Sequence, residues 1–307
     1  MTTPSTPKPI EAKPLKHPSR WITAAVLVIL LGIFVIDAAG REAYGWETYF
    51  DYLLDTRIAT AALHTLAITV LAMLLGVVLG CLLSVMRMSP NPVFRVISWI
   101  YLWLFRGTPV YVQLVFWGLI GSIYQAITIG SWEISLDALL SNMFFLAVIG
   151  LGLNEAAYMA EIMRSGIQAV PAGQVEASKA LGMGWWLTMR RTVLPQAMRI
   201  IVPPTGNELI SMLKTTSLVV AIPYTHELYG RSIDIAASLF QPVPLLMVAA
   251  TWYLGVTSLL MVGQHYLEKY YDKGSKSELS ARQLARLADA EGSLPRNALA
   301  KGPEATD

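Results

Sequence analysis

Long apolar stretches dominate this 307-residue sequence and limit the folds open to it. Strands of a membrane barrel would be shorter and would alternate apolar with polar residues, which these stretches do not. Six windows approach or exceed the roughly 20 residues that an α-helix needs to cross the hydrocarbon of a bilayer: Trp21 to Ile36, Ile58 to Met86, Val96 to Ser122, Asn142 to Ile162, Ile200 to Ile222 and Val243 to Tyr266. The sequence therefore predicts an all-α, polytopic membrane protein with six transmembrane helices.

The composition agrees with this class, because 54% of the residues are hydrophobic and only 14% are charged, an apolar surplus larger than a soluble core can bury. The first window resembles a signal peptide, since basic residues precede it and Ala38, Ala39 and Gly40 follow it. The segment before it is long and rich in proline, however, and five further windows follow. We therefore expect an uncleaved first helix. A single cysteine, Cys81, offers no disulfide.

The distribution of Lys and Arg predicts the orientation, because basic residues in short flanks stay on the cytoplasmic side. With the N-terminus inside, only Arg41, Arg57 and Arg231 fall in outer loops. The inner segments hold the N-terminal arm's basic residues, those of the tail, and Arg87, Arg95, Arg164, Lys179, Arg190, Arg191 and Arg199. Both termini and the loop 163–199 are therefore predicted to face the cytoplasm.

The chain divides into four predicted regions. Residues 1–20 form a cytoplasmic N-terminal arm, and 21–57 contain an extra N-terminal helix with an outer loop. Residues 58–270 form the main transmembrane domain. The tail 271–307 mixes Ala and Leu with many charges, so we expect it to be disordered.

The loop 163–199 has the sequence signals of ordered structure. Val170-Pro171 and Gly173 break the preceding helix, and Gln174 to Leu181 holds good helix formers before Gly182, a residue suited to the left-handed position that ends a helix. Trp185 to Met198 is then expected to form a second, amphipathic helix at the membrane surface. Two interpretations remain open from the residues alone: an interfacial hairpin that only links two spans, or a docking site for a cytoplasmic partner.

The segment "EASKALGMGWWLTMRRTVLP" resembles the signature of inner-membrane permeases of ABC-type importers. Glu176, Ala177, Gly182, Leu194 and Pro195 match it, whereas Ser178 and Thr192 replace an Ala and an Ile. Three more segments are similar to the polar amino acid branch of that family, the histidine, glutamine, glutamate and arginine permease group: "FRGTPVYVQLVFW", "NEAAYMAEIMRSGIQAVPAGQ" and "PPTGNELISMLKTTSLVVAI".

The resemblance implies a type I importer permease with a five-helix core in the bacterial inner membrane. It also implies three partners: a second permease subunit, identical or homologous; a cytoplasmic ABC ATPase homodimer that binds ATP and Mg²⁺; and a periplasmic or tethered amino acid-binding protein. The loop would hold the coupling helix that contacts the ATPase. Its implied coupling residues are Gln174, Glu176, Ala177, Ser178, Ala180, Leu181, Gly182, Leu194 and Pro195.

The sequence has no G-x-x-x-x-G-K-[ST] phosphate loop, so we expect a partner to hydrolyse ATP and this chain to be no enzyme. His17, His64, His226 and His265 lie without the spacing of metal ligands, and we expect neither a bound metal nor a cofactor in this chain. The chain is dominated by apolar windows, and we expect no nucleic acid partner.

Four ionisable residues lie inside predicted windows, where such groups normally face protein or a water-filled cavity: Arg106, Glu155, Glu208 and Lys214. They are interpreted either as contacts for a zwitterionic substrate or as interhelical ion pairs, and pairing is favoured because buried charges are usually paired. Gly107-Thr108-Pro109 should break or kink the third window. The predicted substrate pathway comprises Arg106, Thr108, Gln113, Glu155, Asn207, Glu208, Lys214, Thr216 and Ser217.

The predicted function is import of a polar amino acid as the permease subunit of an ATP-driven, binding-protein-dependent system. One alternative is a secondary transporter, although such a protein tends to show paired internal repeats and none is evident. Another is an ABC importer permease for a different small substrate such as an opine. Selection rests largely with the binding protein, so the sequence indicates no single amino acid.

The excess of basic residues in the predicted inner segments generates a test of topology. In a variant without Cys81, a cysteine at Ser131 should react with a membrane-impermeant thiol reagent in intact cells, and cysteines at Gly173 or Ser293 should react only after permeabilisation. Reaction of the last two in intact cells would reverse the orientation.

Overall fold

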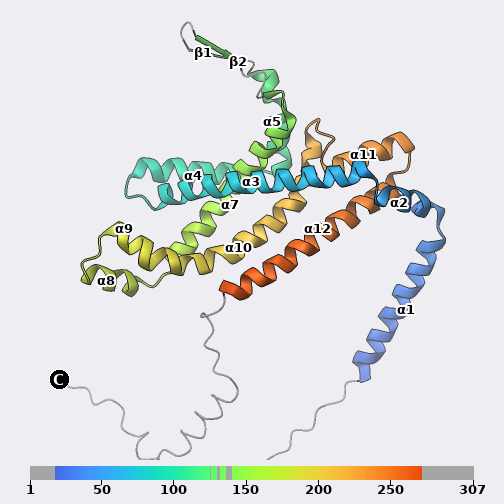
Figure 1. Ribbon diagram of the computed structural model, residues 1–307, viewed down its shortest axis with the longest axis horizontal. Coiled ribbons are helices and arrows are strands. Elements are labelled where there is room, and N and C mark those ends of the chain that lie inside the picture. Colours follow the sequence, from blue (N-terminus) through green and yellow to red (C-terminus); the bar gives the residue numbers. More distant parts are fainter. Residues whose placement is uncertain (1–17, 125, 130–131, 136–139, 272–307) are drawn as a thin grey trace, which may run out of the picture. The chain divides into compact units, whose positions relative to one another are not determined.

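The computed structural model describes residues 18–124, 126–129, 132–135 and 140–271, and its elements are shown in Figure 1. They fall into two compact units. The first unit combines the chain up to Leu63 with Thr225–Trp252, and the second combines His64–Tyr224 with the chain from Tyr253 onward.

The first unit contains α1 (Pro18–Gly40), the 3₁₀ turn η1 (Glu42–Tyr44), α2 (Trp46–Leu53), the start of α3 (Thr56–Met88), α11 (Leu228–Leu239) and the start of α12 (Pro242–Tyr271). Two indole groups link these elements. Trp46 Nε1 donates to the carbonyl oxygen of Ala38 at 3.0 Å, and Trp252 Nε1 donates to that of Leu53 at 2.8 Å. The carbonyl groups at the C-terminal ends of α1 and α2 thus each accept a hydrogen bond from a tryptophan side chain.

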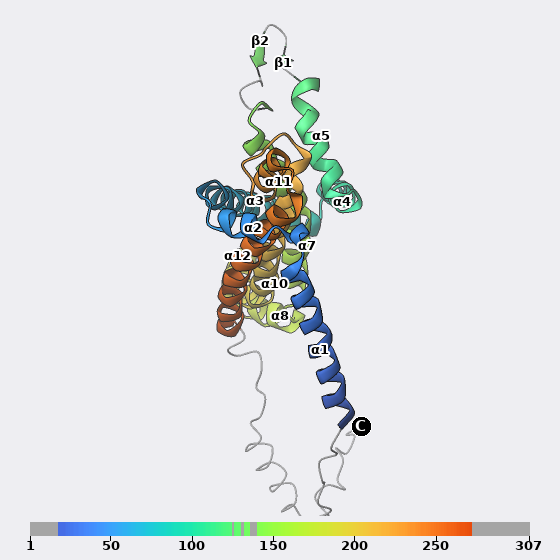
Figure 2. The same ribbon diagram turned by 90° about the vertical axis from the view of Figure 1, so that its right-hand side faces the viewer.

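The second unit holds the rest of α3 and α12. Its other described elements are α4 (Pro92–Gly107), α5 (Val110–Ile123), β1 (Ala126–Ile129), β2 (Trp132–Ser135), α7 (Met143–Gln168), α8 (Ala172–Ala180), α9 (Trp185–Thr188), the π turn η2 (Met189–Val193), α10 (Leu194–Thr215) and the 3₁₀ helix η3 (Thr216–Ala221). The two strands pair antiparallel, with Ala126 opposite Ser135. In both Figure 1 and Figure 2, the β1–β2 hairpin and α8 lie at opposite ends of this unit.

Helix α7 is the centre of the second unit, since 61% of its most apolar window is buried. It packs closely on α3 because glycines on α3 leave room for its side chains. A Cβ at Gly76 would lie 2.7 Å from Cγ of Glu155, and one at Gly80 would lie 2.6 Å from Cβ of Met159. Small residues of this kind let membrane helices approach each other.

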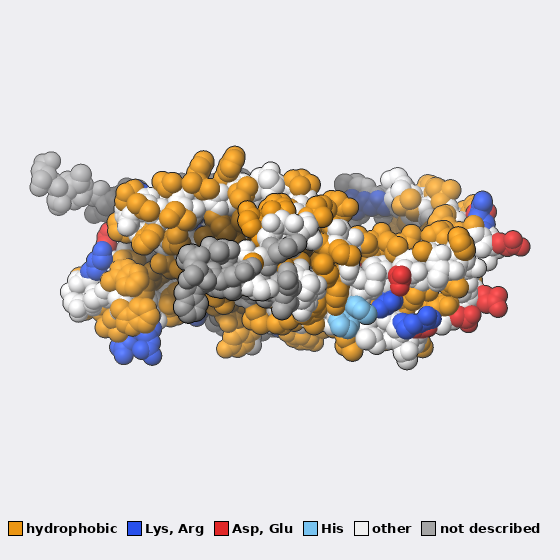
Figure 3. Space-filling model, turned by 90° about the horizontal axis from the view of Figure 1, so that it is seen from above, with side chains coloured by type: hydrophobic (Ala, Val, Ile, Leu, Met, Phe, Trp, Pro, Cys, Tyr) orange, Lys and Arg blue, Asp and Glu red, His pale blue; other side chains and the backbone are white. Residues whose placement is uncertain are grey.

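Four described helices are long and apolar enough to span a bilayer: α1, α3, α7 and α12. Their outer surfaces are largely hydrophobic, and hydrophobic side chains predominate on the face shown in Figure 3. The predicted helical membrane class is confirmed, with one short hairpin that the sequence did not indicate.

The third predicted span, Val96 to Ser122, differs from the structure. It is divided into α4 and α5, which are separated by Thr108 and Pro109. The 16 residues of α4 extend about 24 Å, less than the roughly 30 Å of the hydrocarbon layer. The break that Gly107-Thr108-Pro109 predicted is confirmed, whereas the number of spans stays a prediction.

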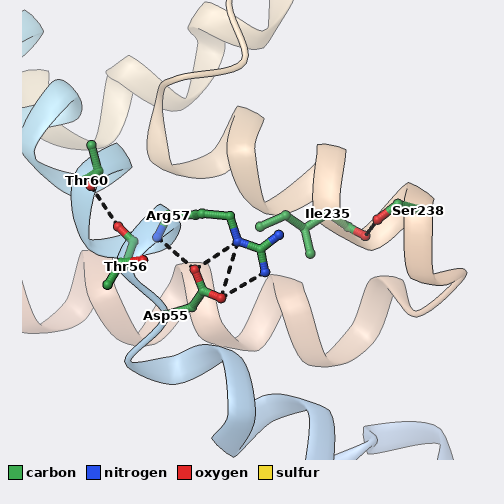
Figure 4. Close-up of polar contacts among 6 residues, drawn as sticks. All are labelled: Asp55, Thr56, Arg57, Thr60, Ile235 and Ser238. Carbon is green, nitrogen blue, oxygen red and sulfur yellow. Dashed lines mark hydrogen bonds and ion pairs between the residues drawn. The ribbon is translucent and has the colours of Figure 1, made fainter.

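Asp55 closes the N-terminal end of α3. Its carboxylate accepts from the backbone N–H of Arg57 at 2.7 Å and pairs with the Arg57 guanidinium at 2.8 Å. Figure 4 shows this pair, with the Arg57 side chain extending toward Ile235 of α11. The adjacent guanidinium holds the pKa of Asp55 below its ordinary value, so the carboxylate stays charged at neutral pH. Its stabilising contribution is present above the ordinary pKa of Asp, about 4, and is lost as the pH falls through the lowered pKa.

Replacing Asp55 with Ala should lower the stability of the purified protein by about 1 kcal/mol at neutral pH, because a helix cap and its charged partner are lost together. Asp51→Ala is the matched control, since Asp51 is an exposed carboxylate of α2. The apparent melting temperature in detergent should fall only for Asp55→Ala. Equal effects of the two variants would contradict the capping role.

Candidate functional site

The loop between α7 and α10 contains the short helix that its sequence predicted. Helix α8 covers Ala172–Ala180, and Gly182 follows in the left-handed region with φ of +75°. The N–H of Gly182 donates to the carbonyl oxygen of Lys179 at 2.9 Å, and that of Met183 to Ser178 at 3.1 Å. A Cβ at Gly182 would meet nothing within 4 Å, so backbone conformation rather than space requires glycine here.

One side of α8 packs on the rest of the loop, and the other side is exposed. Val175 packs against an apolar cluster that includes Val193, Ala197 and Ile201, and Ser178 is buried on the same side. The remaining predicted coupling residues of the helix are exposed, and Leu181 is 82% exposed. The helix therefore has a fixed orientation and a free outer surface.

Ser178 and Thr192, the two residues that depart from the permease signature, contact each other. Their hydroxyl oxygens lie 2.8 Å apart, and Ser178 Oγ also donates to the carbonyl oxygen of Gln174 at 2.8 Å. Because Thr192 belongs to η2, this hydrogen bond joins α8 to the π turn that leads into α10. The two polar residues that replace an Ala and an Ile of the signature are thus hydrogen-bonded to each other across the loop.

The prediction that Trp185 to Met198 forms a separate second helix is wrong. The chain runs from α9 through η2 into α10 without a break. Pro195 does not interrupt it, and lies directly after the π turn as the second residue of α10. Leu194 and Pro195 therefore lie where the loop becomes the long helix.

The interruption between α4 and α5 is stabilised by two side-chain amides. The carbonyl oxygen of Phe105 accepts from Gln113 Nε2 at 3.0 Å and from Asn154 Nδ2 at 2.9 Å. Gln113 Nε2 also lies 2.7 Å from Thr108 Oγ1. The structure thus brings Thr108 and Gln113 together, as residues that hold the break. Asn154 was missed by the sequence analysis, although a lone amide in an apolar helix is a usable signal.

The favoured ion pairs among the intramembrane charges are wrong. Within the described ranges, neither Arg106 nor Lys214 forms an ion pair with Glu155 or Glu208. Arg106 is exposed and lies over the ring of Tyr158, with 5.4 Å between the guanidinium carbon and the ring centroid. The pairing prediction failed because sequence spacing does not indicate which faces of distant helices meet.

Glu155 is buried against Gly76 of α3, and its Oε1 has no hydrogen-bond partner within the described part of the chain. A buried carboxyl group without a full set of partners is costly, and such groups are concentrated at functional sites. The structure therefore leaves Glu155 as a candidate for function rather than as half of a structural pair.

The remaining predicted pathway residues lie on α10 and at its end. Asn207, Glu208 and Lys214 line a pocket of about 560 Å³ together with residues of α12. Thr216 and Ser217 donate to the carbonyl oxygens of Leu213 and Lys214, both at 2.7 Å, where α10 tightens into η3. The nine predicted residues thus form three groups: the α4–α5 break, Glu155, and α10 with its C-terminal end.

Long apolar helices that carry an ordered, partly exposed loop at one end define a helical membrane protein. A family model described as "Binding-protein-dependent transport system inner membrane component" matches residues 72–269. The chain belongs to this family. It is therefore a permease subunit of a bacterial inner-membrane ABC transporter, and the secondary-transporter alternative is set aside.

Individual relatives agree with the family. The chain is 74% identical to the arginine transport system permease protein ArgU of Corynebacterium glutamicum over 95% of this chain and 92% of that protein. It is 32% identical to the nopaline transport system permease protein NocM of Agrobacterium fabrum over 70% of this chain and 89% of that protein. A solved amino acid ABC transporter with histidines is 30% identical, with a TM-score of 0.60, over 70% of this chain and 94% of that chain.

The hydroxyl pair of the loop gives a testable prediction. Ser178→Ala should leave the Thr192 hydroxyl without its partner and cost about 1 kcal/mol, seen as faster amide hydrogen exchange across residues 172–183. Adding Thr192→Ile should cost less than the sum of the single changes, because it removes the second polar partner as well. Ser165→Ala is the control, since the Ser165 hydroxyl is exposed and bonds only to Ile162. Additive effects would show that the two hydroxyl groups act independently.

Proposed function

We propose that this permease imports a cationic amino acid, with arginine as the first candidate substrate. The high identity to an arginine transport system permease over nearly the whole of both chains supports this choice. The weaker identity to a nopaline transport permease makes a nopaline-like substrate the second candidate.

The proposed complex contains two permease subunits, this chain and an identical or homologous copy. A cytoplasmic ATPase homodimer supplies the energy by hydrolysing ATP with Mg²⁺, and a periplasmic or tethered protein delivers the substrate. The family description names a binding-protein-dependent system, and this sequence lacks a phosphate loop of its own.

The loop 163–199 is proposed to couple ATP hydrolysis to transport. The observation that carries this proposal is the fixed attachment of α8: Gly182 closes its end, the Ser178–Thr192 hydrogen bond joins it to η2, and α9, η2 and α10 follow the turn 181–184 as one continuous run. A helix held in this way passes a displacement by its partner to the transmembrane helices as a rigid-body movement. Its contact residues with the ATPase would be Gln174, Glu176, Ala177, Ala180 and Leu181, with Ser178, Gly182, Leu194 and Pro195 fixing the helix.

The substrate pathway is proposed to pass Arg106, Thr108, Gln113, Glu155, Asn207, Glu208, Lys214, Thr216 and Ser217. Ionisable groups in membrane spans normally face protein or water. Four of the pathway residues are ionisable, and within the described chain none of them forms an ion pair with another: Arg106, Glu155, Glu208 and Lys214. Helix interruptions such as the α4–α5 break are tolerated at membrane depth only beside protein or a water-filled cavity.

Two substitutions test the coupling proposal. Gly182→Val places a β-branched residue at φ of +75° and should distort the end of α8 at a cost of at least about 1 kcal/mol. Glu176→Lys reverses a charge on the exposed side of α8. In the reconstituted complex, both variants should reach normal levels, lose uptake, and lose stimulation of ATP hydrolysis by the loaded binding protein.

Gly184→Ala is the matched control for the glycine, because Gly184 has an ordinary φ of −66° and open space around its Cα. It should keep full stimulation, as should Glu176→Gln if only the reversed charge disturbs the partner. Normal stimulation and uptake in Gly182→Val and Glu176→Lys would reduce the loop to a connector.

A further inference from the structure

The pocket between α10 and the C-terminal half of α12 has features of a binding site on the permease itself. Its volume of about 560 Å³ is in the range of small-molecule sites, roughly 300–1,000 Å³. Its polar lining comes from both helices: Glu208, Ser211, Lys214, Gln264, His265 and Glu268. Of these six, only Glu208 and Lys214 were among the pathway residues that the sequence indicated.

Glu268 is held in the pocket by a buried side chain. Gln264 is only 8% exposed, and its Nε2 donates to the carbonyl oxygen of Pro203 at 2.8 Å and to Glu268 Oε1 at 2.9 Å. Gly206 makes room for this arrangement, because a Cβ there would overlap the Gln264 amide. The carboxylate of Glu268 is therefore fixed with respect to α10.

The three charged groups of the pocket have no ionic partners. In the residues that the structure describes, Glu208, Glu268 and Lys214 form no ion pair with one another or with any other side chain. Unpaired charges on membrane helices are costly unless water or a ligand neutralises them. The pocket thus presents two negative groups and one positive group to whatever enters it.

This set of charges is the inverse of that carried by a cationic amino acid, whose ammonium and side chain are positive and whose carboxylate is negative. We propose that the pocket binds a cationic amino acid, with Glu268 contacting its cationic side chain, Glu208 its ammonium and Lys214 its carboxylate. A planar guanidinium suits a carboxylate especially well, because it can donate two parallel hydrogen bonds. The proposal rests on the proposed function for the class of substrate and adds a site on α12 to it.

The test uses the purified permease–ATPase complex in nanodiscs without the binding protein. Equilibrium binding is measured for arginine, for citrulline, which replaces the guanidinium with a neutral group of similar shape, and for agmatine, which lacks the carboxylate. Arginine should bind most tightly. Glu268→Gln should weaken arginine binding about tenfold and citrulline binding less than about twofold, as expected when one charge-assisted contact is lost.

Lys214→Met should weaken the binding of arginine about tenfold. The affinity for agmatine should change by less than about twofold, because agmatine has no carboxylate for Lys214 to contact. Asp51→Asn is the control, as it removes an exposed carboxylate from α2, outside the pocket. Unchanged arginine binding in both pocket variants, or equal losses for all three ligands, would overturn the site.

A second measurement covers the case in which the charge variants fail to assemble. Ser211 is exposed in the pocket, so Ser211→Cys in a Cys81→Ser background should react with a small thiol reagent, and arginine should slow that reaction at lower concentrations than citrulline. Absence of protection would also overturn the site. Uptake of arginine by the wild-type complex with its binding protein is measured in parallel. Loss of protection with normal uptake refutes the pocket alone, whereas absence of uptake refutes the proposed function.

Discussion

Backbone carbonyl groups at helix interruptions need donors from within the protein when the helices lie in a membrane, because lipid supplies none. Side-chain amides meet this need where α4 ends: Pro109 lacks the N–H that would reach the carbonyl oxygen of Phe105, and Gln113 and Asn154 donate to it instead. Gln264 makes a second contact between helices, donating from α12 to the carbonyl oxygen of Pro203 within the unbroken α10. These contacts fix neighbouring helices to one another.

Helix α10 links the loop to the pocket. Helix α10 begins at the end of the loop that carries α8, passes the proline pair, and then presents Glu208 and Lys214 to the pocket. The Ser178–Thr192 hydrogen bond and Gly182 fix α8 to the start of this path. A displacement of α8 can therefore pass through the turn 181–184 and this hydrogen bond, and then along the helical run from α9 to the charged residues of α10. This route is the physical basis of the coupling that we propose between a cytoplasmic partner and the pocket.

The features that sequence predicted correctly are those with local signals. Apolar windows indicated the helical membrane class, Gly182 indicated the end of α8, and Gly107-Thr108-Pro109 indicated the break. Contacts between distant segments could not be predicted in this way. Asn154 lies 49 residues from the carbonyl it bonds, and Gln264 lies 61 residues from its own partner. The expected ion pairs failed for the same reason, since Arg106 lies over an aromatic ring instead.

The central claim is that this chain transports its substrate with energy taken from ATP by a partner. The most direct measurement is uptake of labelled arginine into proteoliposomes that contain the permease, the ATPase and the binding protein, with no ion gradient across the membrane. The account predicts uptake against a concentration gradient that requires ATP and all three proteins. Uptake by the permease alone, driven by a proton or sodium gradient and indifferent to ATP, would contradict it.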